Sequence, residues 1–195
     1  MFVCAVNGSP NLAGNTSFLL KSILGRLEEA KIETEVVNLH RAVSSLKKPY
    51  CTACSDCQGS CYMGTELEEV YEVMKRADVI ILGSPVYFGA PSAQIKTLFD
   101  KSRVLRSGRE LVGKYGAAVS VGGSKYGGQE LVVRAMHDMM LVQGMYILND
   151  GSRQGDAGHG GVCAHRPAAE DDFATKRCEI MAQRIIELRD TLDKP

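Results

Sequence analysis

The chain has 195 residues and carries 23 Lys and Arg against 23 Asp and Glu, so its formal net charge at neutral pH is zero. This balance excludes a general electrostatic attraction to nucleic acid or to an anionic membrane. Apolar runs such as residues 79–82 are too short to span a bilayer, and residues 1–6 lack the basic region of a signal peptide. We therefore expect a single domain over residues 1–195, in a soluble protein of the cytoplasm.

The first predicted element is a strand over residues 2–6, followed by a polar loop and a helix. Gly8 and Gly14 allow successive backbone N–H groups to point into one concavity, and the helix N-terminus adds partial positive charge. The loop contains no lysine and matches neither the Walker pattern nor Gly-x-Gly-x-x-Gly. It predicts a phosphate site for a ligand other than a nucleoside triphosphate, with a polar turn as the alternative. The side-chain donors are Ser9, Asn11, Asn15 and Thr16.

Beyond this helix, short apolar runs alternate with stretches of helical periodicity. Strands are predicted at residues 32–39, 79–82, 115–121 and 146–148. A helix is predicted after a capping box of Thr65 and Glu68, and another has Pro91 in its first turn and runs to about residue 103. Two more are predicted, one over residues 130–142 and one whose apolar face carries Cys178, Met181, Ile185, Leu188 and Leu192. Residues 40–64 and 150–167 are left as long loops, and the second of these must be functional or mobile.

Five alternations of strand and helix predict a parallel sheet with helices on both faces, which is a doubly wound α/β fold. In such sheets the loops that follow the strands lie at the carboxyl edge, where ligands bind. We therefore expect the five loops to meet at one edge. They are the loops that contain Ser9, the cysteine run, Pro85, Gly122 and Asp150.

Seven cysteines are present, and four of them, Cys51, Cys54, Cys57 and Cys61, lie within a loop at about residues 47–64. An odd total without a secretion signal is a poor disulfide framework and favours metal or iron–sulfur ligands. The gaps of two, two and three residues match the ferredoxin run, in which the first three cysteines serve one cluster. Tyr62 follows where ferredoxin has proline, and no second run is present, so the fourth ligand is Cys61 or Cys163. A structural zinc site is the alternative.

The remaining thiols and imidazoles are interpreted more simply. Cys4 and Cys178 are expected to be buried core thiols. His159, Cys163 and His165 are interpreted as polar side chains of a mobile loop rather than as a second metal site.

Three motifs in this order resemble the flavodoxin-like NAD(P)H-dependent FMN reductase superfamily over most of the chain. They are Gly8-Ser9-Pro10 with Gly14-Asn15-Thr16, then Ser84-Pro85-Val86-Tyr87-Phe88-Gly89, then Lys96 with Phe99-Asp100-Lys101. With the cysteine run after the second strand, the chain is most similar to the iron–sulfur flavoproteins, which carry FMN and a [4Fe-4S] cluster. The resemblance implies a flavodoxin-like sheet of five strands in the order 2-1-3-4-5.

The resemblance also implies roles for individual residues. Ser9, Asn11, Asn15 and Thr16 would hold the FMN phosphate, and Pro85, Val86, Tyr87 and Phe88 would run beside the ribityl chain and the flavin ring. Gly122 and Gly123 would let the backbone approach the ring, and Cys51, Cys54, Cys57 and Cys61 would hold the cluster. Packing beneath a loop is the alternative for the two aromatic side chains. No catalytic side chain is expected, because the flavin carries the electron chemistry.

The function that this implies is electron transfer between unlike donors and acceptors, either small molecules or a ferredoxin-like protein. An NAD(P)H-dependent FMN reductase acting on quinones, metals or reactive oxygen is one alternative, and a zinc-stapled flavin-binding sensor is another. We expect a homodimer or homotetramer, because phosphate and ribityl separate cluster from ring within one chain. A two-fold partner could bring its cysteine loop over the ring.

Overall fold

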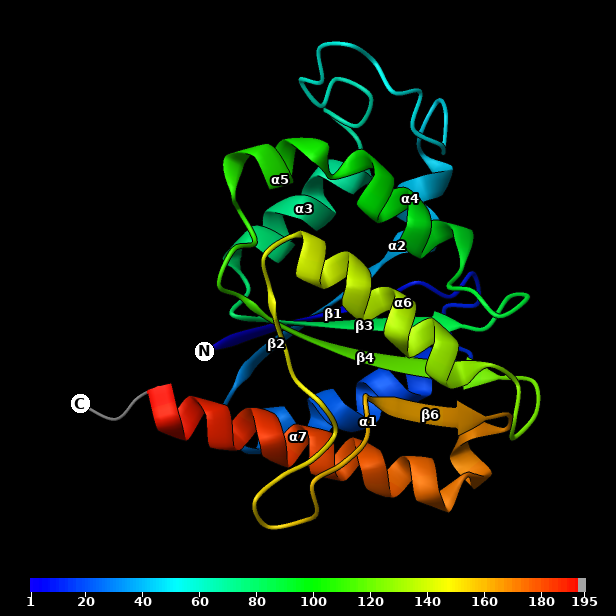
Figure 1. The fold of residues 1–195 in the computed structure, drawn as a ribbon, viewed down its shortest axis with the longest axis vertical. Helices are drawn as coiled ribbons and strands as arrows, with labels where there is room; N and C mark the ends of the chain where they lie inside the picture. Colours follow the sequence, from blue (N-terminus) through cyan, green and yellow to red (C-terminus); the bar gives the residue numbers. More distant parts are fainter. Residues whose placement is uncertain (193–195) are drawn as a thin grey trace.

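The computed structural model describes residues 1–192 and contains one parallel sheet of six strands between two layers of helices (Figure 1). The strands are β1 (Phe2–Asn7), β2 (Glu33–Asn38), β3 (Val79–Pro85), β4 (Tyr115–Gly122), β5 (Tyr146–Ile147) and β6 (Val162–His165). The helices are α1 (Asn15–Glu29), α2 (Leu39–Ser44), α3 (Glu66–Arg76), α4 (Ala93–Lys101), α5 (Arg103–Gly108), α6 (Gln129–Val142), the 3-10 turn η1 (Ala168–Glu170) and α7 (Asp172–Leu192). The strand order β2-β1-β3-β4-β5 confirms the flavodoxin-like, doubly wound fold.

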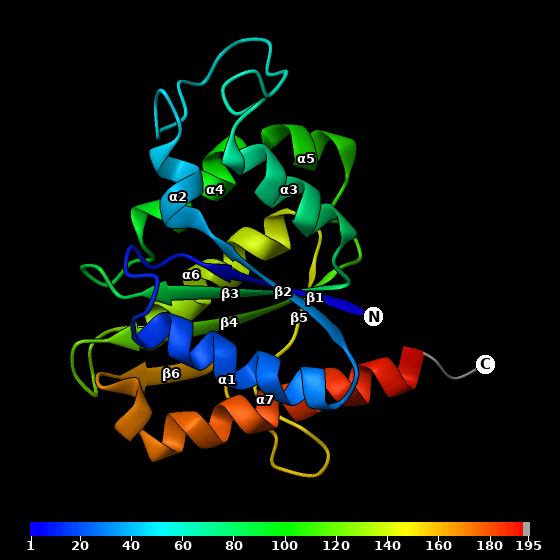
Figure 2. The same cartoon turned by 180° about the vertical axis from the view of Figure 1, so that it is seen from behind.

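The central strands are buried on both faces, which explains why their sequences show no alternation of apolar and polar residues. In β1, Val3 and Ala5 belong to the core shared with α1 and α7, whereas Cys4 and Val6 belong to the core beneath α2 to α6. Figure 2 shows α1 lying along α7 on one face, with the other helices on the opposite face. The apolar stripes of α3 and α6 are buried as predicted, with Leu67 and Met136 fully enclosed.

The fifth strand is divided in two, so the predicted five-strand sheet needs a correction. β5 pairs only with Tyr115 and Gly116 at the start of β4. The chain then leaves the sheet and returns as β6, which pairs with residues 119–122 of β4. The sequence hides this strand because only two apolar side chains, Val162 and Ala164, face the core from it. The Asp150 loop therefore begins near the amino end of β4 rather than at the carboxyl edge of the sheet.

The loop of residues 148–161 is held by a buried ion network. Asp150 is fully buried and accepts hydrogen bonds from Arg177 Nε and from the His159 backbone N–H, both at 2.5 Å. The Arg177 guanidinium also donates to both carboxylate oxygens of Asp156, at 2.8 and 2.9 Å. A buried charge that is paired and hydrogen-bonded in this way stabilises one loop conformation.

The cysteine loop also departs from the expected edge. The segment that leads into it forms α2, which buries Leu39 and Ala42 against the core and was not predicted. From the end of α2 the chain continues outward, so the cysteines lie beyond α4 and α5 instead of beside the other loops (Figure 1). The loops that do meet at the carboxyl edge follow β1, β3 and β4.

Several helix ends differ from the predictions. The helix predicted through to residue 103 is two helices, and Ser92 rather than Pro91 opens α4, because the Ser92 hydroxyl accepts from the Ile95 N–H at 3.3 Å. At α3, the Thr65 hydroxyl caps the helix, but Glu68 accepts from the Gly64 N–H rather than from that of Thr65. α7 is confirmed, although Leu192 at its end is exposed. None of the helices in the described part of the chain is long and apolar enough to cross a membrane. Residues 193–195 of the predicted domain lie outside the described residues.

Candidate functional site

The loop between β1 and α1 is closed by its own polar side chains. The Asn7 carboxamide oxygen accepts from the Ser9 N–H at 3.0 Å, and the Ser9 hydroxyl accepts from the Asn11 N–H at 3.1 Å. Asn11 then accepts from the Ala13 N–H at 3.1 Å. Buried Asn7 also donates to Asn38 at 3.1 Å, which joins the loop to the end of β2. The loop therefore has a fixed shape before any ligand binds.

The N-terminus of α1 opens onto this loop without a side-chain cap. Its N-cap residue is Gly14, and among residues 1–192 no hydrogen bond uses the backbone N–H of Asn15, Thr16 or Ser17. Free N–H groups and the partial positive charge of a helix N-terminus suit a phosphate group. The predicted cradle residues are thus brought together, with Ser9 and Thr16 nearly buried and Asn11 exposed. The arrangement fits the phosphate of FMN.

Glycines at two strand ends let the neighbouring helices approach the cradle. The Gly8 N–H donates to the Gly83 carbonyl at 2.8 Å, and a Cβ on Gly8 would lie 2.4 Å from Ile95 of α4. A Cβ on Gly83 would lie 2.9 Å from the Thr16 methyl group of α1. The Ser92 hydroxyl donates to the Gly8 carbonyl at 2.7 Å. The cradle is therefore fixed against both β3 and α4.

The loop after β3 projects its aromatic side chains into solvent. The Val86 N–H donates to the Val121 carbonyl at 2.9 Å, which ties the loop to β4. Tyr87 and Ala90 exchange two backbone hydrogen bonds of 3.0 Å around a tight turn, in which Phe88 and Gly89 have φ of 51° and 73°. Phe88 is fully exposed and Tyr87 is 47% exposed. Packing beneath the loop therefore does not account for these two residues.

The loop after β4 is organised by Gln129, which the sequence did not single out. Its side-chain amide donates to the Ser124 carbonyl at 2.7 Å and to the Ala164 carbonyl at 3.1 Å, and its oxygen accepts from the Gly127 N–H at 2.9 Å. A Cβ on Gly122 would lie 2.5 Å from this amide. Gly122 thus makes room for Gln129, and only Gly123, whose nearest neighbour would be Arg166 at 3.9 Å, leaves open space for a ligand.

A cavity of about 780 Å³ lies beside this loop, between α6, the end of β6 and the start of α7. The Asp171 carboxylate accepts from the His165 N–H at 3.0 Å and lies 3.6 Å from the His165 ring. The volume is that of a small-molecule site. None of the predicted flavin residues lines this cavity. Its walls include Lys125, Tyr126, Gln129, Leu131, His165 and Phe173.

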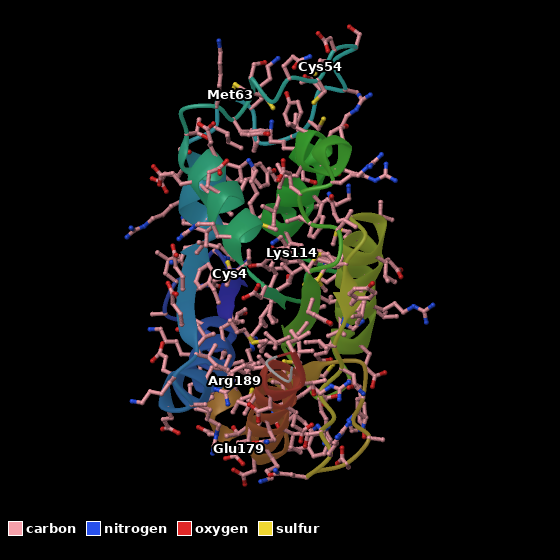
Figure 3. The ribbon with its side chains drawn as sticks, turned by 90° about the vertical axis from the view of Figure 1, so that its left-hand side faces the viewer. Cys4, Cys54, Met63, Lys114, Glu179 and Arg189 are labelled. Atoms are coloured by element: carbon pink, nitrogen blue, oxygen red, sulfur yellow. The ribbon has the colours of Figure 1, made fainter. Side chains whose placement is uncertain are left out.

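The four clustered cysteines are free thiols on an outer loop. Cys51, Cys54 and Cys61 are exposed and Cys57 is half-buried. Desolvation and the adjacent Cys57 thiol raise the pKa of Cys54, so two of the thiols are already close together. Figure 3 places Cys54 at the opposite end of the molecule from Glu179. Within residues 1–192, no three His, Cys, Asp or Glu side chains converge on a point where a metal ion could bind.

The other three cysteines behave differently. Burial raises the pKa of Cys4, Cys163 and Cys178 to about 12. The first and last are the buried core thiols that we expected. Cys163 lies on β6, at the opposite edge of the sheet from β2, so it does not join the cysteine loop of the same chain. His159 Nδ1 lies 3.6 Å from the Asp150 carboxylate, and His165 Nε2 lies 3.6 Å from the Asp171 carboxylate.

Comparison with known proteins shows which family and which proteins the chain is similar to. Residues 1–159 match the family model of the NADPH-dependent FMN reductases. The chain belongs to this FMN reductase family. Iron–sulfur flavoproteins of Methanocaldococcus jannaschii and Methanosarcina thermophila are 38% and 34% identical to it. The first alignment covers 96% of this chain and 97% of the relative, and the second covers 100% and 98%.

Solved structures support the fold of this FMN reductase family member. A WrbA-like flavodoxin of Agrobacterium tumefaciens has a TM-score of 0.69 at 15% identity and covers 97% of both chains. An archaeal flavodoxin has a TM-score of 0.59 at 18% identity and covers 97% of this chain and 99% of its own. At these identities the structures show the fold alone. The family model ends before β6, whereas the iron–sulfur flavoprotein alignments cover nearly the whole chain.

Proposed function

We propose that the protein is an electron-transfer flavoprotein that holds FMN at the carboxyl edge of its sheet and a [4Fe-4S] cluster on its cysteine loop. The observation that carries the proposal is the combination of an uncapped α1 N-terminus with four free thiols on one loop. Full-length relatives named iron–sulfur flavoproteins support the same combination. FMN exchanges electrons in pairs or singly and a cluster exchanges them singly, so together they connect unlike donors and acceptors.

The residues at the carboxyl edge divide the binding of FMN between three loops. The free N–H groups of α1 would hold the phosphate, together with Ser9, Asn15 and Thr16. Asn15 already accepts from the Ala168 N–H at 2.8 Å, so its amide nitrogen is the group left to donate. Tyr87 and Phe88 supply exposed aromatic surface for the ring. Gly123 supplies backbone beside an open space.

Cys51, Cys54, Cys57 and Cys61 are proposed as the cluster ligands. Their chemistry suits the role, because thiolates are the usual ligands of iron–sulfur clusters and none of these thiols is committed to the core or to a disulfide. The alternative is a zinc ion bound by the same four thiolates, and analysis of the metal content distinguishes it from the cluster.

The positions of the two sites support a homodimer as the working unit. The cysteine loop lies beyond α4 and α5, away from the loops that would hold the flavin (Figure 1). The flavin edge also exposes an apolar patch of Tyr87, Phe88, Tyr126 and Leu131, and contiguous patches of this kind mark interaction sites. A second copy related by a two-fold axis could cover this patch and bring its own cluster to the ring. The external redox partners would then be small molecules or a ferredoxin-like protein.

The composition of the purified protein tests the proposal directly. We expect anaerobically purified protein to contain FMN, iron and acid-labile sulfide. Cys54→Ser should abolish the cluster while FMN remains bound, and Cys163→Ser should keep both as the matched control. Recovery of zinc without sulfide, of FAD in place of FMN, or of a normal cluster in Cys54→Ser would contradict it. Rapid bleaching of the flavin by NADH or NADPH would favour the reductase alternative.

A further inference from the structure

Tyr62 is the residue of the cysteine loop that is anchored in the core. It is only 5% exposed, although its neighbours Cys61 and Met63 are both exposed. Its ring packs edge to face on Tyr71 of α3, with the ring centroids 4.8 Å apart and an interplanar angle of 73°. Figure 3 shows the same end of the molecule, with Cys54 and Met63 projecting from this loop. Tyr62 therefore fixes the position of the loop from below.

The hydroxyl of Tyr62 lies against the turn that connects Cys57 and Cys61. Gly59 is within that turn at φ of 77°, and a Cβ there would lie 2.7 Å from the Tyr62 hydroxyl oxygen. The Gly59 carbonyl also accepts from the N–H groups of Tyr62 and Met63, at 3.0 and 3.3 Å. The turn thus closes around the phenol, between two of the proposed cluster ligands.

The two tyrosines of the stacked pair differ in what their hydroxyl groups do. The Tyr71 hydroxyl donates to the Leu98 carbonyl at 2.6 Å. Among residues 1–192, every hydrogen bond of Tyr62 uses its backbone, and its hydroxyl donates to no protein group. The Tyr62 hydroxyl is therefore free to donate, and the turn that it faces carries Cys57 and Cys61 at its two ends.

We propose that the Tyr62 hydroxyl donates a hydrogen bond to a sulfur atom at the Cys57–Cys61 side of the cluster and thereby sets its reduction potential. The inference rests on the proposed function, because it requires a cluster on these thiols. Reduction adds negative charge to the cluster, and a hydrogen bond to sulfur stabilises the more negative state. The hydroxyl of Tyr62 therefore makes the cluster easier to reduce. Because the donor is held by the Tyr71 ring, its direction is set by the fold and not by the loop alone.

The test compares Tyr62→Phe with Tyr71→Phe, since each variant keeps its ring and loses one hydroxyl. In Tyr62→Phe we expect unchanged iron, sulfide and FMN contents and a midpoint potential of the cluster that shifts to a more negative value. A tenfold change in the reduction equilibrium is about 59 mV for a one-electron couple. In Tyr71→Phe the potential should stay at the wild-type value. Redox titration followed by electron paramagnetic resonance measures both.

The outcomes separate this inference from the proposed function. A normal cluster in Tyr62→Phe with the wild-type potential overturns the inference alone. Wild-type protein without iron and sulfide overturns the proposed function and the inference with it. Loss of the cluster only in Tyr62→Phe, with normal FMN content and thermal unfolding, supports the hydroxyl contact. Loss in both variants overturns it, because the tyrosine pair then serves only to pack the loop.

Discussion

At the scale of single residues, the cradle depends on groups that the protein leaves without internal partners. The N–H groups at the start of α1 are free, and Thr16 beside them is nearly buried. Its methyl group occupies the space that Gly83 provides, which orients the rest of the side chain. Asn15 is oriented in turn by its bond from Ala168. Two donors are therefore held in position by contacts outside the loop.

Replacing Thr16 by valine tests one of these donors without disturbing its packing. The valine keeps the methyl group at Gly83 and removes the hydroxyl. We expect FMN affinity to fall by about 1–3 kcal/mol, because a hydrogen bond to a charged phosphate is lost. Fluorescence titration of the apoprotein with FMN measures this effect. Thr34→Val on β2, whose hydroxyl bonds only Glu28, should bind like wild type. If Thr16→Val binds FMN as tightly as the wild type, the Thr16 hydroxyl does not contact the phosphate.

At the scale of elements, the site depends on how closely α1 and α4 approach the ends of β1 and β3. Gly8 and Gly83 face each other across these strands and leave no room for a side chain. The alternating burial of β1 places α1 on one face and α4 on the other. Helix positions at the carboxyl edge are thus set by two glycines as much as by the apolar cores.

Gly83→Ala should destabilise the protein and weaken FMN binding together. Its Cβ would lie 2.8 Å from Leu20 and 2.9 Å from Thr16, so these two side chains of α1, or the helix itself, must shift away from β3. Overpacking of this kind costs about 1–3 kcal/mol in the free energy of unfolding.

The matched control is Gly25→Ala, in the middle of α1, where a Cβ meets nothing within 4 Å. It should stabilise the protein by up to about 1 kcal/mol, because alanine is the better helix former. Urea unfolding and FMN titration of both variants check this pair. Wild-type behaviour of Gly83→Ala would show that α1 need not approach β3 so closely.

At the scale of the whole molecule, the flavin edge and the cysteine loop lie in different regions of the surface (Figure 1). The loops after β1, β3 and β4 meet at the edge, whereas α2 directs the cysteines outward. An exposed apolar patch covers the edge between these loops. Because the flavin edge and the cysteine loop are separated in this way, we propose that the chain assembles with a second copy.

Phe88→Asp should weaken self-association, because it places a charge in the centre of the exposed patch. We expect the dimer dissociation constant to rise by at least tenfold, which corresponds to about 1.4 kcal/mol. Sedimentation velocity over a range of concentrations measures it, and Leu141→Asp on the exposed side of α6 is the control. A wild-type protein that stays monomeric while passing electrons from cluster to flavin would contradict the cross-subunit arrangement.

Most of the fold could be predicted because its signals are local. Continuous apolar runs identified the central strands, and helical periodicity identified α3, α6 and α7. The cradle residues are predicted from the same kind of local signal, since the glycines and polar side chains between β1 and α1 are adjacent in sequence. β6 and α2 were missed because each has few residues and little apolar surface of its own. Gln129 was missed because its three partners come from separate positions along the chain.

The alternation of strands and helices, the polar loop between β1 and α1 and the spacing of the thiols could be recognised from the sequence alone, because they depend on periodicity and on neighbouring residues. The order of the strands was implied by the family resemblance. The tertiary structure was needed to place Cys163 at the far edge of the sheet, to show that the Asp150 loop does not begin at the carboxyl edge, and to show that Tyr62 is buried beneath the cysteines. Each of these depends on where distant segments meet when the core closes. That outcome is set by packing across the whole chain.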